Sequence, residues 1–398
     1  MPVSNTTAQY GSVAKVFHWL TALGIFLVIP LGIIANDLPY DTAEELAQKA
    51  WLFSLHKTVG ITIFFVALAR IVWALTQPKP AALHPDRKEE SLAAETVHWL
   101  LYGSLVLVPL SGWVHHAATE GFAPIWWPFG QNLPLVPESN TVAEAAAGLH
   151  IVFERVLILS LLLHIAGAVK HAVIDKDGTL SRMWFGAGKA EGKEAPRKHG
   201  LPAALAIVIW AAALGIGGTL GVYQKGSVAA AVALQEVESD WQVRDGTLAI
   251  TVQQMGSAVR GEFATWTAQI AFDDTVTEGV AGNVTVEVAI ASLSLGSVTN
   301  QAMGADYFNA EAFPTAQFTA DILNTADGYV AEGTLALKGV EQPITLPFEL
   351  TLDGPLATME GSTTLNRQNY GIGDGMTDEN QLAFDVVVNV ALTAQRGE

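Results

Sequence analysis

The 398-residue chain has no cysteine, and only 15% of its residues are charged. Without thiols it cannot form disulfides, iron–sulfur clusters, thiolate zinc sites or covalently attached c-type heme. A soluble domain usually has about 25% charged residues, whereas half of this chain is hydrophobic, so one ordinary soluble domain is excluded. Basic residues are also scarce, with 21 Lys and Arg against 39 Asp and Glu, so the chain lacks the basic surface typical of nucleic-acid binding.

The charged residues and the histidines are unevenly distributed. Residues 1–222 have 15 basic and 16 acidic side chains, a net charge of −1. Residues 223–398 have 6 basic and 23 acidic side chains, a net charge of −17. All ten histidines precede position 200. The chain therefore has two chemically different halves.

Five apolar stretches are long enough to cross a bilayer, which takes about 20 residues of helix. We place them at residues 14–35, 53–75, 95–116, 149–173 and 201–222. The first is not expected to be a cleaved signal peptide, because it lacks a basic leader beyond Lys15 and contains a histidine. The sequence therefore predicts an all-α transmembrane region with five spans.

Lys and Arg in the short loops predict the orientation, because cytoplasmic loops are enriched in them. The loops after the second and fourth spans contain nine Lys and Arg, whereas the loops after the first and third contain only Lys49. We therefore expect a multi-pass protein of a bacterial inner membrane with a cytoplasmic N-terminus. Residues after about 222 are then expected in the periplasm.

Four histidines within the spans are the strongest functional candidates, because ionisable residues inside a membrane are costly. His150 and His164 are 14 residues apart on the fourth span, which places them within roughly 40° of one helix face and about 21 Å apart. In an antiparallel bundle, His150 lies at the level of His56 and His164 at the level of His18. We therefore predict an outer histidine pair, His56 with His150, and an inner histidine pair, His18 with His164, each able to hold one heme iron.

The alternative is that these histidines are interfacial or hydrogen-bonded residues, the commoner fate of a single membrane histidine. Four of them at paired depths favour ligation instead. His98 and His116 on the third span compete as a pair, but at about 27 Å apart they are expected at the two membrane interfaces. Together with Lys57, Arg155 and His171, they are candidate contacts for propionates, quinone or an anionic substrate.

The first and third spans also share a weak repeated sequence pattern. His-Trp-Leu opens the first and third spans, and each is followed by proline and glycine, at residues 18–20, 30 and 32 and at residues 98–100, 109 and 112. Convergent interfacial tryptophans are the alternative explanation. Arg70 and Glu154, near span ends, are interpreted as snorkelling side chains.

Residues 10–185 resemble the bacterial cytochrome b561 family. The motifs that carry the resemblance are Phe17-His18-Trp19-Leu20, Leu55-His56-Lys57-Thr58-Val59-Gly60, His98 with Pro109-Leu110-Ser111-Gly112-Trp113, Leu149-His150 with His164, and Lys176-Asp177-Gly178-Thr179-Leu180. The resemblance implies a four-helix diheme bundle with two heme b groups, ligated by His18, His56, His150 and His164. It also implies electron exchange with the quinone pool. One close relative is a superoxide oxidase that passes an electron from superoxide to ubiquinone, and another role in the family is the anchor cytochrome of a partner dehydrogenase.

The second half changes to a period of two from residue 241. Apolar residues alternate with small or polar ones at 248–252, 284–290 and 384–392. Turn signals at Asp245-Gly246, Asp327-Gly328 and Asp353-Gly354 separate the runs. This pattern predicts an all-β antiparallel barrel or sandwich. Its small interior residues leave room for a ligand, and a filled core is the alternative.

Residues 236–394 resemble the YceI-like family of lipocalin-type barrels. The carrying segments are residues 292–293, 305–309, 313–318, 333–335, 338–344 and 365–371. The resemblance implies a lipid-binding domain for long isoprenoid chains, including quinone tails. Candidate residues of the lipid cavity are Phe263, Phe308, Phe313 and Phe318. The chain departs from the family at residues 253–256, which replace an early histidine, and at residues 300–301, which replace an Arg-Asp pair.

These observations predict a multi-domain membrane protein. We expect a cytochrome b561 domain at residues 1–188, a linker with the fifth span at 189–235 and a YceI-like β-barrel at 236–398. The expected function is electron transfer between a periplasmic one-electron partner and quinone, with superoxide:ubiquinone oxidoreduction as the leading activity. A non-catalytic anchor subunit for a dehydrogenase and a membrane-tethered lipid carrier are the alternatives.

Overall fold

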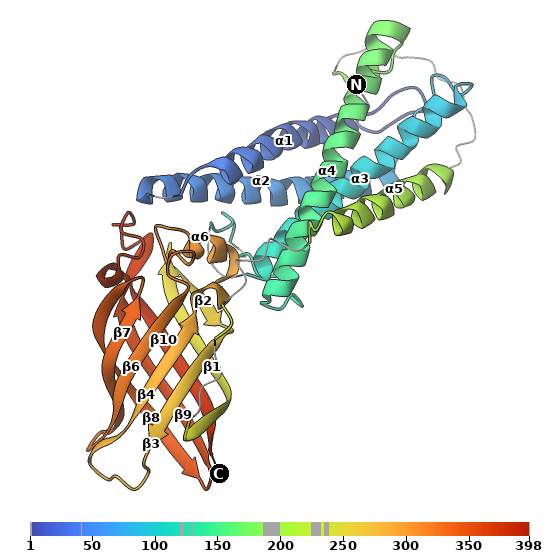
Figure 1. Ribbon diagram of the computed structural model, residues 1–398. Helices are drawn as coiled ribbons and strands as arrows, with labels where there is room; N and C mark the ends of the chain where they lie inside the picture. Colours follow the sequence, from blue (N-terminus) through green and yellow to red (C-terminus); the bar gives the residue numbers. More distant parts are fainter. Residues whose placement is uncertain are drawn as a thin grey trace. The chain divides into compact units, whose positions relative to one another are not determined.

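The computed structural model describes residues 2–40, 42–119, 123–128, 130–185, 200–223, 232–234 and 239–397. The chain divides into two compact units, one built mainly from long helices and one mainly from β-strands (Figure 1). Parts of the predicted linker segment, residues 189–199, 224–231 and 235, lie outside the described residues. The multi-domain fold class predicted from the sequence is confirmed.

Five long helices form the first unit, and all five are long and apolar enough to cross a membrane. They are α1 (Ser12–Asp37), α2 (Ala43–Leu75), α3 (Lys88–Ala117), α4 (Asn140–Lys170) and α5 (Gly200–Thr219). A π-helical turn, η1 (His171–Asp175), continues α4, and a short 3-10 helix follows at Ser181–Met183. The helix α2 begins ten residues earlier than its predicted apolar stretch, because a polar turn with Glu44 and Glu45 precedes the span.

The helices bury a narrow core and leave most of their apolar surface outside. Only 11–28% of each apolar window is buried. One core cluster joins α1, α2, α3 and α4 through residues such as Ile25, Ile63 and Leu105. A second cluster packs α5 against α3 and α4 through Ala206 and neighbours. Such an inverted distribution of apolar residues suits a helix bundle that has lipid as its solvent.

The β-strands form one curled, entirely antiparallel sheet of ten strands. They are β1 (Trp241–Gln254), β2 (Ser257–Phe263), β3 (Trp266–Phe272), β4 (Gly279–Ala289), β5 (Leu293–Ser294), β6 (Thr315–Thr325), β7 (Gly328–Leu337), β8 (Val340–Asp353), β9 (Leu356–Asn366) and β10 (Leu382–Arg396). The order across the sheet is β3-β4-β6-β7-β8-β9-β10-β1-β2-β5. The sheet curls until β3 meets the start of β1, where the Asp240 N–H donates to the Ile270 carbonyl.

The alternation read from the sequence matches the inward face of this barrel. Leu248, Ile250 and Val252 of β1 line its interior, as do Val386 and Val388 of β10. Asp327-Gly328 and Asp353-Gly354 lie at tight connections, as predicted. The turn predicted at residues 245–246 is wrong, because these residues lie inside β1 at a register irregularity opposite β10. An acidic, glycine-bearing pair thus marks a bulge here rather than a strand end.

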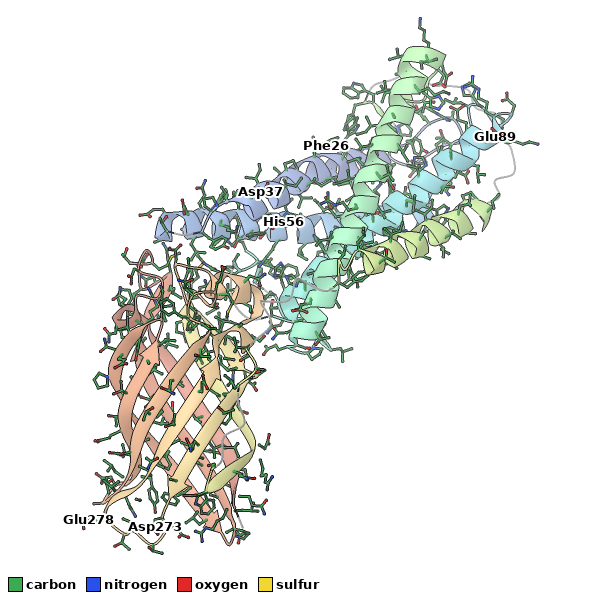
Figure 2. The ribbon with its side chains drawn as sticks, viewed as in Figure 1. Phe26, Asp37, His56, Glu89, Asp273 and Glu278 are labelled. Carbon is green, nitrogen blue, oxygen red and sulfur yellow. The ribbon has the colours of Figure 1, made fainter. Side chains whose placement is uncertain are left out.

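Each end of the barrel has a distinct character. At one end β1 finishes opposite the start of β10, close to the short helix α6 (Thr299–Met303) and the 3-10 turn η5 (Arg367–Tyr370). At the other end lies the β3–β4 connection, where Figure 2 labels Asp273 and Glu278. Aromatic rings gather near that second end, with Trp241 against Phe272 and Phe272 against Tyr329.

Candidate functional site: paired histidines in the helices and a cavity in the barrel

The structure brings His56 of α2 and His150 of α4 together, as the outer histidine pair requires. Their ring centroids are 6.4 Å apart, with the ring planes at 79°. Figure 2 labels His56 among the helices. A metal lies about 2 Å from an imidazole nitrogen, so two such nitrogens on opposite sides of one metal are about 4 Å apart, and the ring centres a little over 1 Å further out on each side. The observed spacing therefore fits one iron held between the two rings.

Both outer histidines are oriented by backbone carbonyls of neighbouring helices. His56 Nδ1 lies 2.9 Å from the Val28 oxygen on α1, and His150 Nδ1 lies 2.8 Å from the Val108 oxygen on α3. A carbonyl only accepts, so each Nδ1 must donate its hydrogen. In the neutral ring, Nε2 then keeps its lone pair, which is the tautomer that binds a metal. The donor chemistry of this pair thus fits heme iron.

Glycines on α1 and α3 make room for these two rings. A Cβ on Gly32 would lie 2.7 Å from His56 Cε1, and a Cβ on Gly112 would lie 2.9 Å from His150 Nδ1. Gly32 is four residues after Val28, and Gly112 is four residues after Val108. The repeated sequence pattern on the first and third spans therefore has a structural role. Each of these two helices supplies one carbonyl that orients a histidine and, one turn later, one glycine that leaves space for the ring.

Three imidazoles meet at the inner level rather than two. The rings of His18 and His164 are 6.2 Å apart, a spacing similar to that of the outer pair. His98 of α3 also lies beside His164, at 5.2 Å between centroids, although the sequence placed it at a membrane interface. Arg70 Nη2 donates to His18 Nδ1 at 3.3 Å, so His18 would have to change tautomer to bind iron through Nε2. Sequence reasoning missed this contact by treating Arg70 as a snorkelling side chain.

The candidate contact residues divide between the histidine sites and the surface. Lys57 is buried, with 6% of its surface exposed, next to His56 in sequence. His116 is within electrostatic reach of Lys57, His56 and His150. Arg155, by contrast, has 72% of its side chain exposed and pairs with Glu154 at 3.3 Å. The structure thus places Lys57 and His116 at the outer pair and leaves Arg155 on the outside of the helix.

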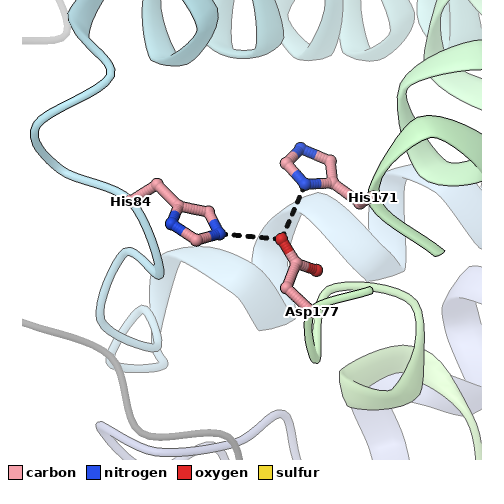
Figure 3. A group of neighbouring side chains, drawn as sticks. All are labelled: His84, His171 and Asp177. Carbon is pink, nitrogen blue, oxygen red and sulfur yellow. Dashed lines mark hydrogen bonds and ion pairs between the residues drawn. The ribbon is translucent and has the colours of Figure 1, made fainter. Parts of the chain in front are cut away.

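His171 belongs to a separate polar cluster, which sequence reasoning had not assembled. Asp177 Oδ2 accepts from His171 Nδ1 and from His84 Nε2, each at 2.8 Å (Figure 3). Glu90 of α3 adds a contact of 3.2 Å to His171 Nε2, and Lys170 pairs with the same carboxylate. The cluster joins the chain before α3 to the end of α4, and the motif at residues 176–180 was the signal that could have located it.

Asp177 stays ionised in this cluster. Burial alone would raise the pKa of its carboxyl, but hydrogen bonds from Thr179, His84 and His171 outweigh that effect and lower the pKa well below its usual range. The donor atoms of His84, His171 and Asp177 lie within 4.8 Å of one another, a spacing that could also hold a metal ion. The arrangement can fix the orientation of the His171 ring and exchange protons with solvent through the part-exposed His84.

The barrel encloses a cavity of about 310 Å³ with an almost wholly apolar lining. Phe263, Phe308 and Phe318 line it. Phe313 does not belong to the lining and instead packs against Gly339 of the β7–β8 turn. A volume at the lower end of small-molecule pockets suits an extended hydrocarbon chain.

Comparisons with known proteins agree with this division. A family model described as prokaryotic cytochrome b561 matches residues 9–186, and one described as YceI-like domain matches residues 223–394. "Cytochrome b561 homolog 2" of Escherichia coli is 29% identical over 184 residues, which cover 46% of this chain and 95% of the relative. "Probable superoxide oxidase CybB" of Yersinia pestis is 24% identical over 177 residues, covering 44% and 95%.

Among solved structures, Burkholderia cenocepacia BcnA is similar to the barrel. It is 27% identical and covers 38% of this chain and 96% of its own, with a TM-score of 0.36. By the two family models, the chain is similar to a membrane cytochrome in its helical region and to a lipocalin-like domain in its strand-forming region. The similarity of its N-terminal region to prokaryotic cytochrome b561 implies b-type heme, and its C-terminal region is similar to YceI-like domains.

Proposed function

We propose that this protein transfers electrons across a bacterial inner membrane between a periplasmic one-electron partner and the quinone pool. In this proposal the outer and inner histidine pairs each hold one heme b. The barrel, on the periplasmic side, binds quinone or another isoprenoid lipid. The domain boundaries at residues 188 and 235 go with this proposal.

The observation that carries the proposal is the geometry of His56 and His150. Two rings from different helices lie at the spacing of a bis-imidazole metal site, and both are held in the tautomer that leaves Nε2 free. Heme bound there would supply one-electron redox chemistry. A hydrogen bond from Nδ1 to a carbonyl also raises the basicity of a ligand imidazole and tunes the metal that it binds.

Superoxide is the donor that we favour, following the name of the Yersinia relative. The balanced reaction oxidises two superoxide anions to two molecules of dioxygen and reduces one quinone to quinol with two protons. The buried Lys57, in its protonated form, would favour an anion near the outer pair. The net charge of −17 on residues 223–398 acts against it, because an acidic surface repels anions.

The polar cluster around His171 suits the quinone side of this reaction. Quinone reduction needs a hydrogen-bond donor at each quinone oxygen and a supply of protons. The Asp177 carboxylate orients the His171 ring, and His84 connects the same carboxylate to solvent. We therefore propose His171 as a quinone contact, with Asp177 as its positioning residue.

Replacement of His150 by Ala tests the ligand assignment. We expect the full-length variant to lose one heme of two in a pyridine hemochrome assay. The matched control is His115→Ala, because the His115 ring makes the same kind of hydrogen bond, to the Ala143 carbonyl, outside either histidine pair. Unchanged heme content in His150→Ala would reject the outer pair.

Steady-state reduction of a soluble quinone by the isolated protein separates the enzyme from the alternatives. Turnover with superoxide alone supports the oxidoreductase. Turnover only after addition of a co-purifying dehydrogenase indicates an anchor subunit. A protein without any quinone reductase activity but with bound isoprenoid indicates a lipid carrier.

A further inference from the structure

The polar groups of the barrel cavity are concentrated at one end. Gln254 is the last residue of β1, Gln301 and Tyr307 come from α6 and its continuation, and Arg367 and Tyr370 begin and end η5. These elements are in contact, because Arg367 donates to the carbonyl of Leu382, which pairs with Gln254 across the sheet. A bound lipid chain would therefore have its polar head at this end and its tail toward Trp241 and Phe272.

Arg367 is the one charged residue of the described lining, but its charge is fully engaged. All five of its N–H groups donate to backbone carbonyls, those of Ala383, Ile372, Gly373, Met376 and Leu382. A guanidinium has no further donor. The residue thus ties η5 to β10 and has nothing left to bind a phosphate or a carboxylate.

Two other polar atoms of the lining have no hydrogen-bond partner among the described residues. Gln254 is 5% exposed and Tyr370 is 2% exposed, and both the Gln254 Oε1 atom and the Tyr370 hydroxyl are buried without a partner. Burial raises the pKa of Tyr370 to about 12, so the phenol stays a neutral donor. An unmet buried polar group costs about 1–3 kcal/mol in a protein, so both atoms indicate a ligand group that pairs with them.

We propose that the cavity selects a long-chain lipid with an uncharged hydroxyl head, which donates to Gln254 Oε1 and accepts from the Tyr370 hydroxyl. An alcohol or a quinol satisfies both atoms. An oxidised quinone has only acceptors and satisfies Tyr370 alone. Lipids with phosphate or carboxylate heads are excluded, because their charge would be buried without a free cation. This inference rests on the proposed lipid-binding function and names the chemistry of its ligand.

Binding to the full-length protein in detergent tests the inference, with bound lipid quantified by native mass spectrometry. The probes are farnesol, farnesyl phosphate and the headless hydrocarbon farnesene. We expect farnesol to bind about three- to tenfold more tightly than farnesene, the worth of a neutral hydrogen bond or two. Farnesyl phosphate should bind at least about a hundredfold more weakly than farnesol. Decylubiquinol should likewise bind more tightly than decylubiquinone.

The variant Tyr370→Phe isolates the head contact. It should lower farnesol affinity about three- to tenfold and leave farnesene binding unchanged, since only the hydroxyl is lost. The control is Tyr329→Phe, because the Tyr329 hydroxyl contacts Asn324 and this residue is not part of the lining. It should change neither affinity.

The outcomes distinguish failure of the lipid-binding function from failure of the hydroxyl-head assignment. Absence of binding by farnesol and farnesene alike overturns the lipid-binding function itself. Equal binding of farnesol and farnesene, preference for farnesyl phosphate or decylubiquinone, or an equal loss of both probes in Tyr370→Phe overturns only the hydroxyl-head assignment.

Discussion

Substitution of Gly112 by Ala probes the support of the outer histidine pair without replacing either histidine. The new Cβ would lie 2.9 Å from His150 Nδ1 and 3.0 Å from Cε1, whereas real Cβ atoms essentially never approach closer than 3.0 Å. Both atoms belong to the stiff His150 ring. Its Nδ1 donates a hydrogen bond of 2.8 Å to the carbonyl of Val108, which is on α3 like Gly112. The methyl group must therefore push the His150 ring away from α3.

The size of the effect follows from these distances. An ordinary contact begins at 3.4 Å, so the ring must move by roughly 0.5 Å, which stretches the hydrogen bond to about 3.3 Å and weakens it. Loss of such a support of a metal ligand costs about 10- to 100-fold in metal affinity, or about 1.4–2.7 kcal/mol. The outer heme should lose affinity by that factor, while the inner heme is unaffected.

Heme titration of the full-length protein, followed by reduced-minus-oxidised spectra and a redox titration, measures this change. We expect one of two heme components to bind more weakly or to shift in potential. Gly215→Ala is the control, because a Cβ at this position of α5 meets nothing within 4 Å. Two hemes with wild-type affinity and potentials in Gly112→Ala would show that the ring contact plays no part in heme binding.

For three further substitutions, the structure predicts whether folding stability rises or falls. Arg367→Met should destabilise the barrel by about 3–5 kcal/mol, because it leaves five buried carbonyls without their donor; a change below about 1 kcal/mol in thermal unfolding contradicts this. Gln254→Leu should raise the stability of the lipid-free barrel by about 1 kcal/mol, because it removes an unpaired buried amide oxygen, yet it should weaken farnesol binding. The lowered pKa of Asp177 adds stability that is complete above its unfolded pKa of about 4 and is lost as pH falls toward the folded value. Asp177→Asn should therefore reduce the loss of folding stability as pH falls below about 4. An unchanged dependence of stability on pH in this range would contradict that role.

Local sequence properties predict much of the structure of the helical half. Hydropathy over about 20 residues locates each span, and the helical rise relates His150 to His164 on one face. The pairing of His56 with His150 and of His18 with His164 needed only the antiparallel order of the spans. The approach of His98 to His164 could not be predicted in this way, because it depends on how α3 is rotated about its own axis.

The barrel shows a similar limit. A period of two identified the inward residues of β1, β4 and β10, because every second side chain of a strand faces the same side. It could not show that residues 245–246 form a bulge, which depends on the register with β10. It also could not separate Phe313 from the three phenylalanines of the cavity, since the packing of Phe313 on Gly339 joins two distant turns.

Composition and periodicity are local properties, and they were enough to divide the chain into an apolar helical half with all the histidines and an acidic, strand-forming half. Which atoms meet depends on the packed fold. The carbonyls of Val28 and Val108 orient two imidazoles from other helices, and Arg367 uses every donor on backbone that lies nearby only after folding. Hydrogen bonds depend on distance and direction between groups far apart in the chain, and those are fixed only when the helices and strands have packed.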